Sequence, residues 1–156
     1  MSEASPAAQL SEFIDRYDPE IAAFARAALS QLRKRLPGAV ELVYDNYNAL
    51  AIAFGPTDRA SEAVVSIALY PRWVTLFFAQ GARLEDPRRR LRGSGVKMRH
   101  VVLQQPADVA VPDIERLIAA ALEAAGWKPD GRRKRRLLIK AVSGKKRPRR
   151  AAAAVG

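Results

Sequence analysis

The sequence predicts an α+β domain in which an antiparallel sheet of about five strands carries an N-terminal and a C-terminal helix on one face, as a two-layer sandwich. Three observations support this prediction: the first two indicate the helices and the strands, and the third marks where the domain ends. Apolar residues recur at three- and four-residue spacing over 21–36 and 114–125, which is typical of helices with one buried side. Residues 39–79 are rich in β-branched and aromatic runs separated by turn residues. Beyond residue 126 the sequence becomes strongly basic.

The first long helix is expected to begin at Asp18-Pro19, because Asp can cap a helix by accepting an amide hydrogen bond and Pro suits the first helical turn. Pro37-Gly38 ends it. Its inward stripe comprises Ile21, Phe24, Ala25, Ala28, Leu29, Leu32 and Leu36, and a short leading helix is expected around Leu10, Phe13 and Ile14. A second amphipathic helix is expected from Pro112, with Gly126 as its cap.

The strands are expected at Val40–Tyr47, Leu50–Phe54, Ala63–Tyr70, Trp73–Ala79 and Met98–Leu103. Pro71-Arg72 predicts a tight antiparallel hairpin, although Pro is not favoured in primed two-residue turns and a longer loop is possible. In the tight register Ile67 faces Leu76 on an apolar face that forms the core. The opposite face carries small residues edged with Tyr70, Trp73 and Phe77. A short helical turn is expected at 88–91.

Composition predicts one cytoplasmic domain at 10–126, between a flexible N-terminus at 1–9 and a largely disordered basic tail at 127–156. The absence of cysteine excludes disulfides, thiol nucleophiles and thiolate metal sites, and fits a reducing compartment. The first residues contain acids and no apolar segment, so no signal peptide is expected. No stretch approaches the roughly 20 apolar residues that cross a bilayer, so no membrane partner is expected.

The net charge of +11 is concentrated in one segment. Residues 127–156 contain twelve Lys or Arg and one acid, Asp130, and therefore carry the whole net charge, while residues 1–126 hold equal numbers of basic and acidic side chains. The predicted domain is thus neutral, and the high isoelectric point of the chain describes the tail.

Three segments carry a family resemblance: Leu42-Val43-Tyr44-Asp45-Asn46-Tyr47-Asn48-Ala49-Leu50, then Ser66-Ile67-Ala68-Leu69-Tyr70-Pro71, then Gly93-Ser94-Gly95-Val96-Lys97-Met98-Arg99-His100. In this order they resemble the YdhG-like family, a domain-of-unknown-function family of small bacterial proteins, over about residues 10–125. The resemblance implies a helix, an antiparallel sheet and a closing helix, an arrangement similar to frataxin. Some relatives are described as frataxin-like iron chaperones, and the family has no agreed activity.

A candidate anion site is formed by Gly93, Gly95, Lys97, Arg99 and His100. Backbone amides of a glycine-rich turn can bind an anion with help from nearby cations, although the spacing is not that of a Walker A loop. The alternative is a turn that needs positive φ before a strand with a charged exposed face. His100, the only histidine, is either a general base or ligand, or a half-buried structural residue.

The face bearing Tyr70, Trp73 and Phe77 is a candidate shallow apolar binding surface. The alternative is that residues 80–97 fold back and cover it.

Glu12, Asp15, Asp18 and Glu20 lie near the first helix, where the frataxin resemblance implies an acidic ridge, and hard cations prefer such oxygen donors. Arg16 interrupts this cluster and Asp18 has a capping role, so no metal site is expected there.

The tail supplies the candidate nucleic-acid contacts: Arg132, Arg133, Lys134, Arg135, Arg136, Lys145, Lys146, Arg147, Arg149 and Arg150. Such tails bind phosphates without sequence preference, through counterion release. Leu137, Leu138, Ile139 and Val142 interrupt the charge and could add a short strand or helix. Without aromatic residues after Trp127, the tail is not expected to read bases. The alternative is a solubilising tail with incidental affinity for polyanions.

No set of catalytic residues and no cofactor motif is recognisable. The sequence therefore predicts a non-enzymatic binding module that associates nonspecifically with nucleic acid or another polyanion through its tail. The alternative is a carrier of a small anionic ligand or of iron, of the frataxin-like type, that acts through the folded domain.

Overall fold

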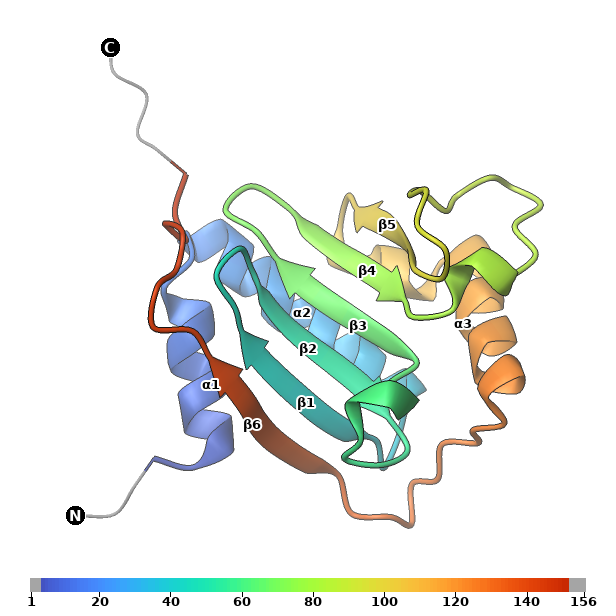
Figure 1. Cartoon of the computed structure of the whole chain (residues 1–156), viewed down its shortest axis with the longest axis horizontal. Helices are drawn as coiled ribbons and strands as arrows, with labels where there is room; N and C mark the ends of the chain where they lie inside the picture. Colours follow the sequence, from blue (N-terminus) through green and yellow to red (C-terminus); the bar gives the residue numbers. More distant parts are fainter. Residues whose placement is uncertain (1–3, 152–156) are drawn as a thin grey trace.

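The computed structural model describes residues 4–151, which form an α+β fold with one six-stranded sheet (Figure 1). The helices are α1 (Pro6–Asp15), α2 (Pro19–Arg35) and α3 (Pro112–Ala125), with short 3-10 turns η1 (Ala60–Glu62), η2 (Gly81–Arg83) and η3 (Pro106–Ala110). The strands are β1 (Val40–Asp45), β2 (Leu50–Gly55), β3 (Val65–Leu69), β4 (Val74–Phe78), β5 (Arg99–Leu103) and β6 (Arg136–Val142). The α+β class is as predicted, but the sheet has six strands in place of the expected five.

The strand order is β5-β4-β3-β2-β1-β6, and all neighbours are antiparallel except β1 and β6, which are parallel. The predicted hairpin register is confirmed, with Ile67 opposite Leu76. The loop is tight: the Tyr70 amide donates to the Trp73 carbonyl at 2.9 Å across Pro71 and Arg72. The turn therefore tolerates the proline that made a longer loop conceivable.

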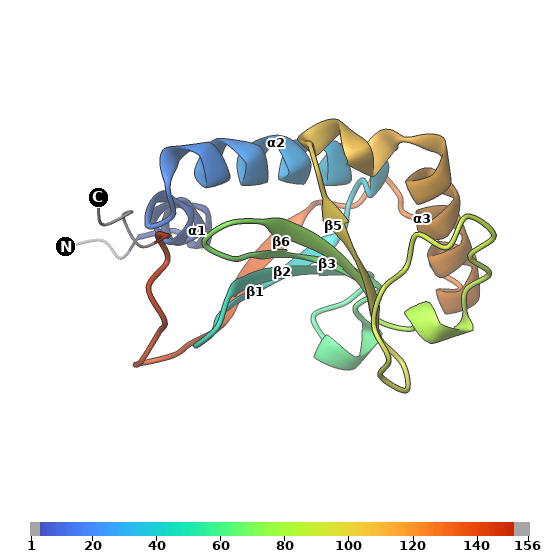
Figure 2. The ribbon, with the colours of Figure 1, turned by 90° about the horizontal axis from the view of Figure 1, so that it is seen from above.

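One core joins the helices to one face of the sheet. Figure 2 shows α1 and α2 on that side, and α3 beside the end of the sheet where β2 and β4 finish. Residues of α2, the sheet and α3 are buried in a single cluster that includes Leu29, Leu32, Ile52, Ile67, Leu69, Leu76, Phe78, Leu117 and Ile118. The alternation of the strands thus buries the expected face.

The helix boundaries follow the local sequence closely. The α2 helix begins at Pro19 as predicted, but the Asp18 side chain makes no bond to its first turn and instead accepts the Ala151 amide at 3.4 Å. Gly126 ends α3 in the left-handed conformation, at φ 66°, as predicted. The leading helix α1 begins at Pro6, so residues 6–9 are helical where flexibility was expected; residues 1–3 lie outside the described residues.

The expectation of a disordered tail is wrong for residues 127–151. Strand β6 pairs in parallel with β1 through the apolar interruption of the basic run, and Leu137 and Ile139 pack against the core. The preceding segment is held as well, because Gly38 leaves room for the Asp130 carbonyl: a Cβ at residue 38 would collide with it. The remainder of the expected tail, 152–156, lies outside the described residues.

The helical turn that was expected at 88–91 is not formed. The Asp86 carboxylate accepts the amides of Arg90 and Leu91, both at 2.8 Å, and so replaces the carbonyls that a helix would offer them. Arg89 adopts a positive φ of 52°, which a helix does not allow. The segment is a turn closed by one side chain.

Candidate nucleic-acid interface

Two carboxylates of β1, Glu41 and Asp45, point toward the helices and are almost fully buried. They share this face with Val43, because alternate residues of a strand point the same way. Buried charges require partners, since desolvation of an unpaired carboxylate costs several kcal/mol or more. Their partners decide which cations of residues 127–151 remain at the surface.

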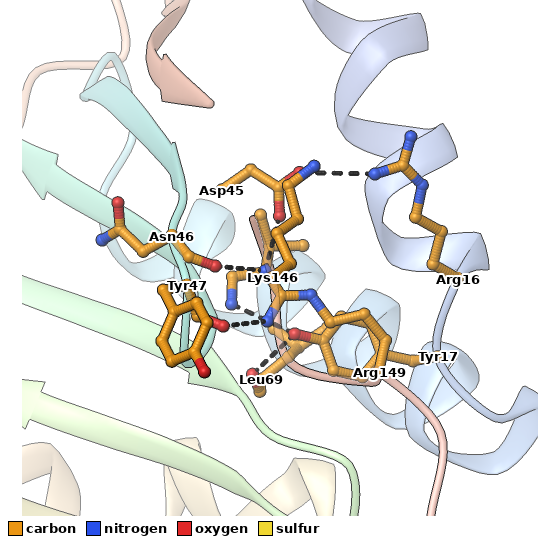
Figure 3. Close-up of polar contacts among 9 residues, drawn as sticks. Arg16, Tyr17, Asp45, Asn46, Tyr47, Leu69, Lys146 and Arg149 are labelled. Carbon is orange, nitrogen blue, oxygen red and sulfur yellow. Dashed lines mark hydrogen bonds and ion pairs between the residues drawn. The ribbon is translucent and has the colours of Figure 1, made fainter. Parts of the chain in front are cut away.

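Three cations surround Asp45 (Figure 3). Arg149 donates to one carboxylate oxygen at 2.9 Å, while Lys146 and Arg16 lie 2.7 and 3.6 Å from the other. The Lys146 contact lacks hydrogen-bond geometry, so it acts as an ion pair. Arg149 is itself buried and also donates to the backbone carbonyls of Asn46 and Tyr47. This group, here called the Asp45 cluster, fixes the segment after β6 to the β1–β2 turn.

Tyr17 forms the floor of the Asp45 cluster. Its hydroxyl donates to the Leu69 carbonyl at 2.8 Å and accepts the Leu50 amide at 3.1 Å, and the Arg149 guanidinium lies over its ring, 5.7 Å from the centroid. Burial raises the pKa of Tyr17 to about 12, more than the nearby guanidinium lowers it. Tyr17 is therefore a neutral structural residue at physiological pH.

Glu41 is held from two sides. Arg33 on α2 binds it as a fork, with nitrogen–oxygen distances of 2.8 to 3.2 Å, and Arg135 approaches at 3.4 Å just before β6. The parallel pairing of β6 with β1 thus brings cations from both ends of β6 to acids of β1. Arg135, before β6, lies near Glu41, and Arg149, after β6, binds Asp45. Three of the predicted nucleic-acid contacts, Arg135, Lys146 and Arg149, thus pair with buried carboxylates, and of these Arg135 keeps 51% of its side chain exposed.

The other expected tail contacts divide into two groups. Arg132 pairs with Asp130 at 3.1 Å, and its hydrogen bonds lower the pKa of that carboxyl group; Arg150 donates to the Arg16 carbonyl at 3.3 Å. The second group comprises the other predicted nucleic-acid contacts, which are all exposed. Within residues 4–151, no acid lies within ion-pair distance of any of them. These five residues, here called the β6 cations, are Arg133, Lys134, Arg136, Lys145 and Arg147.

The face of the sheet turned away from the helices is here called the open face. It contains a hollow of about 510 Å³. The hollow is lined by Asn46, Tyr47, Asn48, Ala49, Ala51, Ser66, Ala68, Tyr70, Phe77, Met98 and Ser143. No residue of 80–97 lines it, so the expectation that this segment folds back as a cover is wrong. Figure 2 shows loops at both ends of this face and no α-helix across it.

Two pairs of aromatic rings lie on the open face, and one ring of each pair, Tyr70 or Phe77, lines the hollow. Tyr70 and Trp73 stack with centroids 5.6 Å apart, and Phe77 and His100 lie 5.4 Å apart in a tilted arrangement. The predicted aromatic edge and the only histidine thus meet on one face, since His100 is opposite Phe77 in the β4–β5 register. His100 is half-buried, and its ring packs against that of Phe77.

The glycine loop is organised by its own arginine. Gly93 has a φ of 116°, and the Arg99 guanidinium donates to the carbonyls of Gly95 and Met98. Arg99 is opposite Phe78 and so belongs to the strand face away from His100, while Lys97 is exposed. Gly93 lies beside both Arg99 and His100, since a Cβ on Gly93 would be 3.5 Å from Arg99 Cδ and 3.6 Å from His100 Nδ1. The Arg99 guanidinium is, however, bound to carbonyls of the loop itself, and the positive φ of Gly93 fits the turn alternative.

The acidic residues near α1 are also dispersed. Asp15 pairs with Arg26 at 2.6 Å, and Asp18 receives the Ala151 amide. Among residues 4–151, no group of three or more His, Asp or Glu side chains is placed to hold a metal ion. In the same range, no helix combines the length and apolar character required to cross a bilayer.

Comparison with known proteins gives no match to a family model, to a curated protein or to a solved structure.

The β1 carboxylates are the residues that sequence reasoning missed. The signal was present: Glu41 and Asp45 flank Val43 at two-residue spacing, so an apolar Val43 in the core places both acids there too. Two buried acids then require cations, and the basic segment after residue 131 is the largest supply.

Proposed function

We propose that the protein is a non-enzymatic binding module that associates with nucleic acid through the β6 cations, without reading base sequence. The observation that carries the proposal is the position of these cations at the two ends of β6. They lie beside an open face whose strand positions contain no acid. Those positions hold Val40, Leu42, Tyr44, Ala51, Ala53, Gly55, Ser66, Ala68, Thr75, Phe77, His100, Val102, Arg136, Leu138 and Ala141.

Spacing supports contact with several phosphates at once. Arg133, Lys134 and Arg136 precede or begin β6, whereas Lys145 and Arg147 follow it. A seven-residue strand spans roughly 20 Å, at about 3.3 Å per residue. Lys140 lies between the two groups and is exposed. A polyanion that runs along this edge can therefore meet both groups and release counterions at each.

The fold and family belong to the same proposal. The three segments that resemble the YdhG-like family support membership in it, together with a two-layer, frataxin-like arrangement. The resemblance names no activity, so the function rests on the surface charge. Iron carriage is less well supported, because Asp15 in the acidic cluster is already paired with Arg26.

The test is neutralisation of four of the five β6 cations in the full chain, with Arg135 and Arg149 kept in place because they compensate buried acids. The variant carries Arg133→Gln, Lys134→Gln, Lys145→Gln and Arg147→Gln. Fluorescence anisotropy with duplex DNA should give the wild type a Kd of about 10⁻⁴–10⁻⁶ M at physiological salt. The variant should bind at least about tenfold more weakly, with a log Kd against log salt slope reduced by up to about 0.9 per lost contact.

A matched control removes the same charge elsewhere through Lys34→Gln, Arg88→Gln, Arg89→Gln and Arg116→Gln, all at exposed positions outside residues 127–151. It should retain most of the wild-type affinity and salt slope. Equal loss in the two variants would mean that net charge, and not the β6 surface, attracts the polyanion. Retention of full affinity by the β6 variant would contradict the proposal outright.

A further inference from the structure

We propose that the open face binds unpaired bases, so that the ligand of this protein is single-stranded nucleic acid. The inference rests on the proposed association through the β6 cations and adds the place where bases are held. It assigns the aromatic rings of the open face to stacking and the surrounding cations to phosphates.

The rings are accessible and rigidly placed. Trp73 and Tyr47 are 47% and 48% exposed, and Tyr70 and Phe77 are half-buried. Each is fixed by a neighbour, Trp73 by the Tyr70 ring and Tyr47 by the Arg147 guanidinium at 5.8 Å. A ring that is already oriented loses little freedom when a base stacks on it, and any base can supply the second ring.

The surface between the rings suits a flat ligand. Ala51, Ser66 and Ala68 line the hollow and project little from the strands. Larger side chains at these central positions would fill the space that a base requires. Asn46, Asn48 and Ser143 add polar groups at the end of the hollow next to the β1–β2 turn. The hollow thus offers aromatic faces, a shallow floor and hydrogen-bonding groups at one end.

The positive charge at the edge of the hollow favours a nucleic acid over an apolar partner. Ser143 brings the segment after β6 to the hollow, and Lys145 and Arg147 follow within four residues. Phosphates can therefore lie beside these cations while bases turn inward, with no strand carboxylate to repel them. In a duplex the bases are stacked on one another, so a side-chain platform of this kind is available only to unpaired ones.

The first experiment compares three probes on the wild-type chain: a thymidine oligonucleotide, an abasic oligomer with the same number of phosphates, and a duplex of equal length. The oligonucleotide should bind at least about fivefold more tightly than the abasic oligomer, because each stacked base contributes that much or more. Both should show the same salt slope, since their phosphates are identical. Equal affinity for the two would overturn the inference while leaving the proposed phosphate association intact.

The second experiment removes rings. Tyr47→Ala with Trp73→Ala should weaken oligonucleotide binding at least about fivefold and leave duplex and abasic binding within about twofold. Val96→Ala with Val142→Ala is the control, because both valines are exposed apolar residues that carry no ring on which a base could stack. An unchanged oligonucleotide affinity in the ring variant, with a wild-type melting curve, would overturn the assignment.

Fluorescence provides a readout that needs no loss of binding. In a Trp127→Phe background Trp73 is the only tryptophan, and stacking of a base should quench its emission with the oligonucleotide but not with the abasic oligomer. Absence of quenching at saturation would contradict base contact at this ring. If none of the probes binds, the proposed function itself fails. A dimer that Trp73→Ala dissociates would instead identify a second copy as the occupant.

Discussion

Asp45 and Arg149 stabilise the fold only as a pair. Both side chains are nearly inaccessible to water, so each was desolvated at a cost that the attraction between them offsets. Removal of one leaves the other charged in a low-dielectric site. Lys146 on the second carboxylate oxygen softens this loss but does not replace the bonds that Arg149 makes to two backbone carbonyls.

Arg149→Met should therefore lower the free energy of unfolding by roughly 3 kcal/mol, measured by urea denaturation. Arg150→Met is the matched control and should cost less than about 0.5 kcal/mol, because Arg150 is exposed and bonds only to one surface carbonyl. Addition of Asp45→Asn to Arg149→Met should restore part of the loss. Similar costs for the two arginines would show that the Asp45 cluster is not a structural element.

Tyr17 gives the cluster a defined response to alkaline pH. Its folded pKa of about 12 lies above the ordinary value of 10.0, so the folded state binds the proton more tightly than the unfolded state. This contribution is complete below pH 10 and is lost as pH rises from 10 to 12. The stability advantage of wild type over Tyr17→Phe should shrink by about 2–3 kcal/mol over that window.

Paired urea melts of wild type and Tyr17→Phe, from about pH 8 to about pH 12, test this linkage. At neutral pH the variant should already lose about 1–3 kcal/mol, because the buried Leu50 amide has lost its acceptor. A stability difference that stays constant through the alkaline range would mean that Tyr17 ionises without hindrance in the folded protein.

Strand β6 is as much a part of the sheet as the strands of the expected domain. It supplies Leu137 and Ile139 to the core, and it is bounded by the cations that neutralise Glu41 and Asp45. A chain that stops at Gly126 therefore lacks one strand of the sheet. It also leaves the buried acids Glu41 and Asp45 without several of their cationic partners. Such a truncation cannot separate a binding tail from a stable body.

The chain ending at Gly126 should show no cooperative thermal unfolding transition, or one lowered by more than about 10 °C, as followed by circular dichroism. A chain ending at Ala151 is the control and should melt like the full sequence, because every described contact remains. An unchanged transition in the shorter chain would mean that residues 127–151 are dispensable for folding.

The sequence predicted those elements whose boundaries and register are set by residues close together in the chain. The β3–β4 register followed from alternation on both sides of a two-residue loop, and the α3 boundary followed from Gly126. Strand β6 was harder, because its apolar residues are few and lie between Arg136 and Lys140. Its pairing depends on a partner about a hundred residues earlier, which no local pattern records.

At the scale of the whole molecule, the neutral body and residues 127–151 of the charged tail are one folded unit. The predicted open face with Tyr70, Trp73 and Phe77 could be recognised from the strand period alone. The division of the basic residues between internal pairs and exposed surface could not, because it depends on which β1 positions face the helices. Summed charge thus overstated the number of cations available to a ligand, since Lys146 and Arg149 are largely buried against Asp45.

The parallel pairing of β6 with β1 also orders events during synthesis. A nascent chain makes β1 early, with Glu41 and Asp45 already facing the growing core, and makes Arg135, Lys146 and Arg149 about a hundred residues later. Until then the two acids have only Arg33 and Arg16 as partners. The sheet is therefore completed only after β6 has been made, through a contact of high sequence separation, which is the slow kind to form.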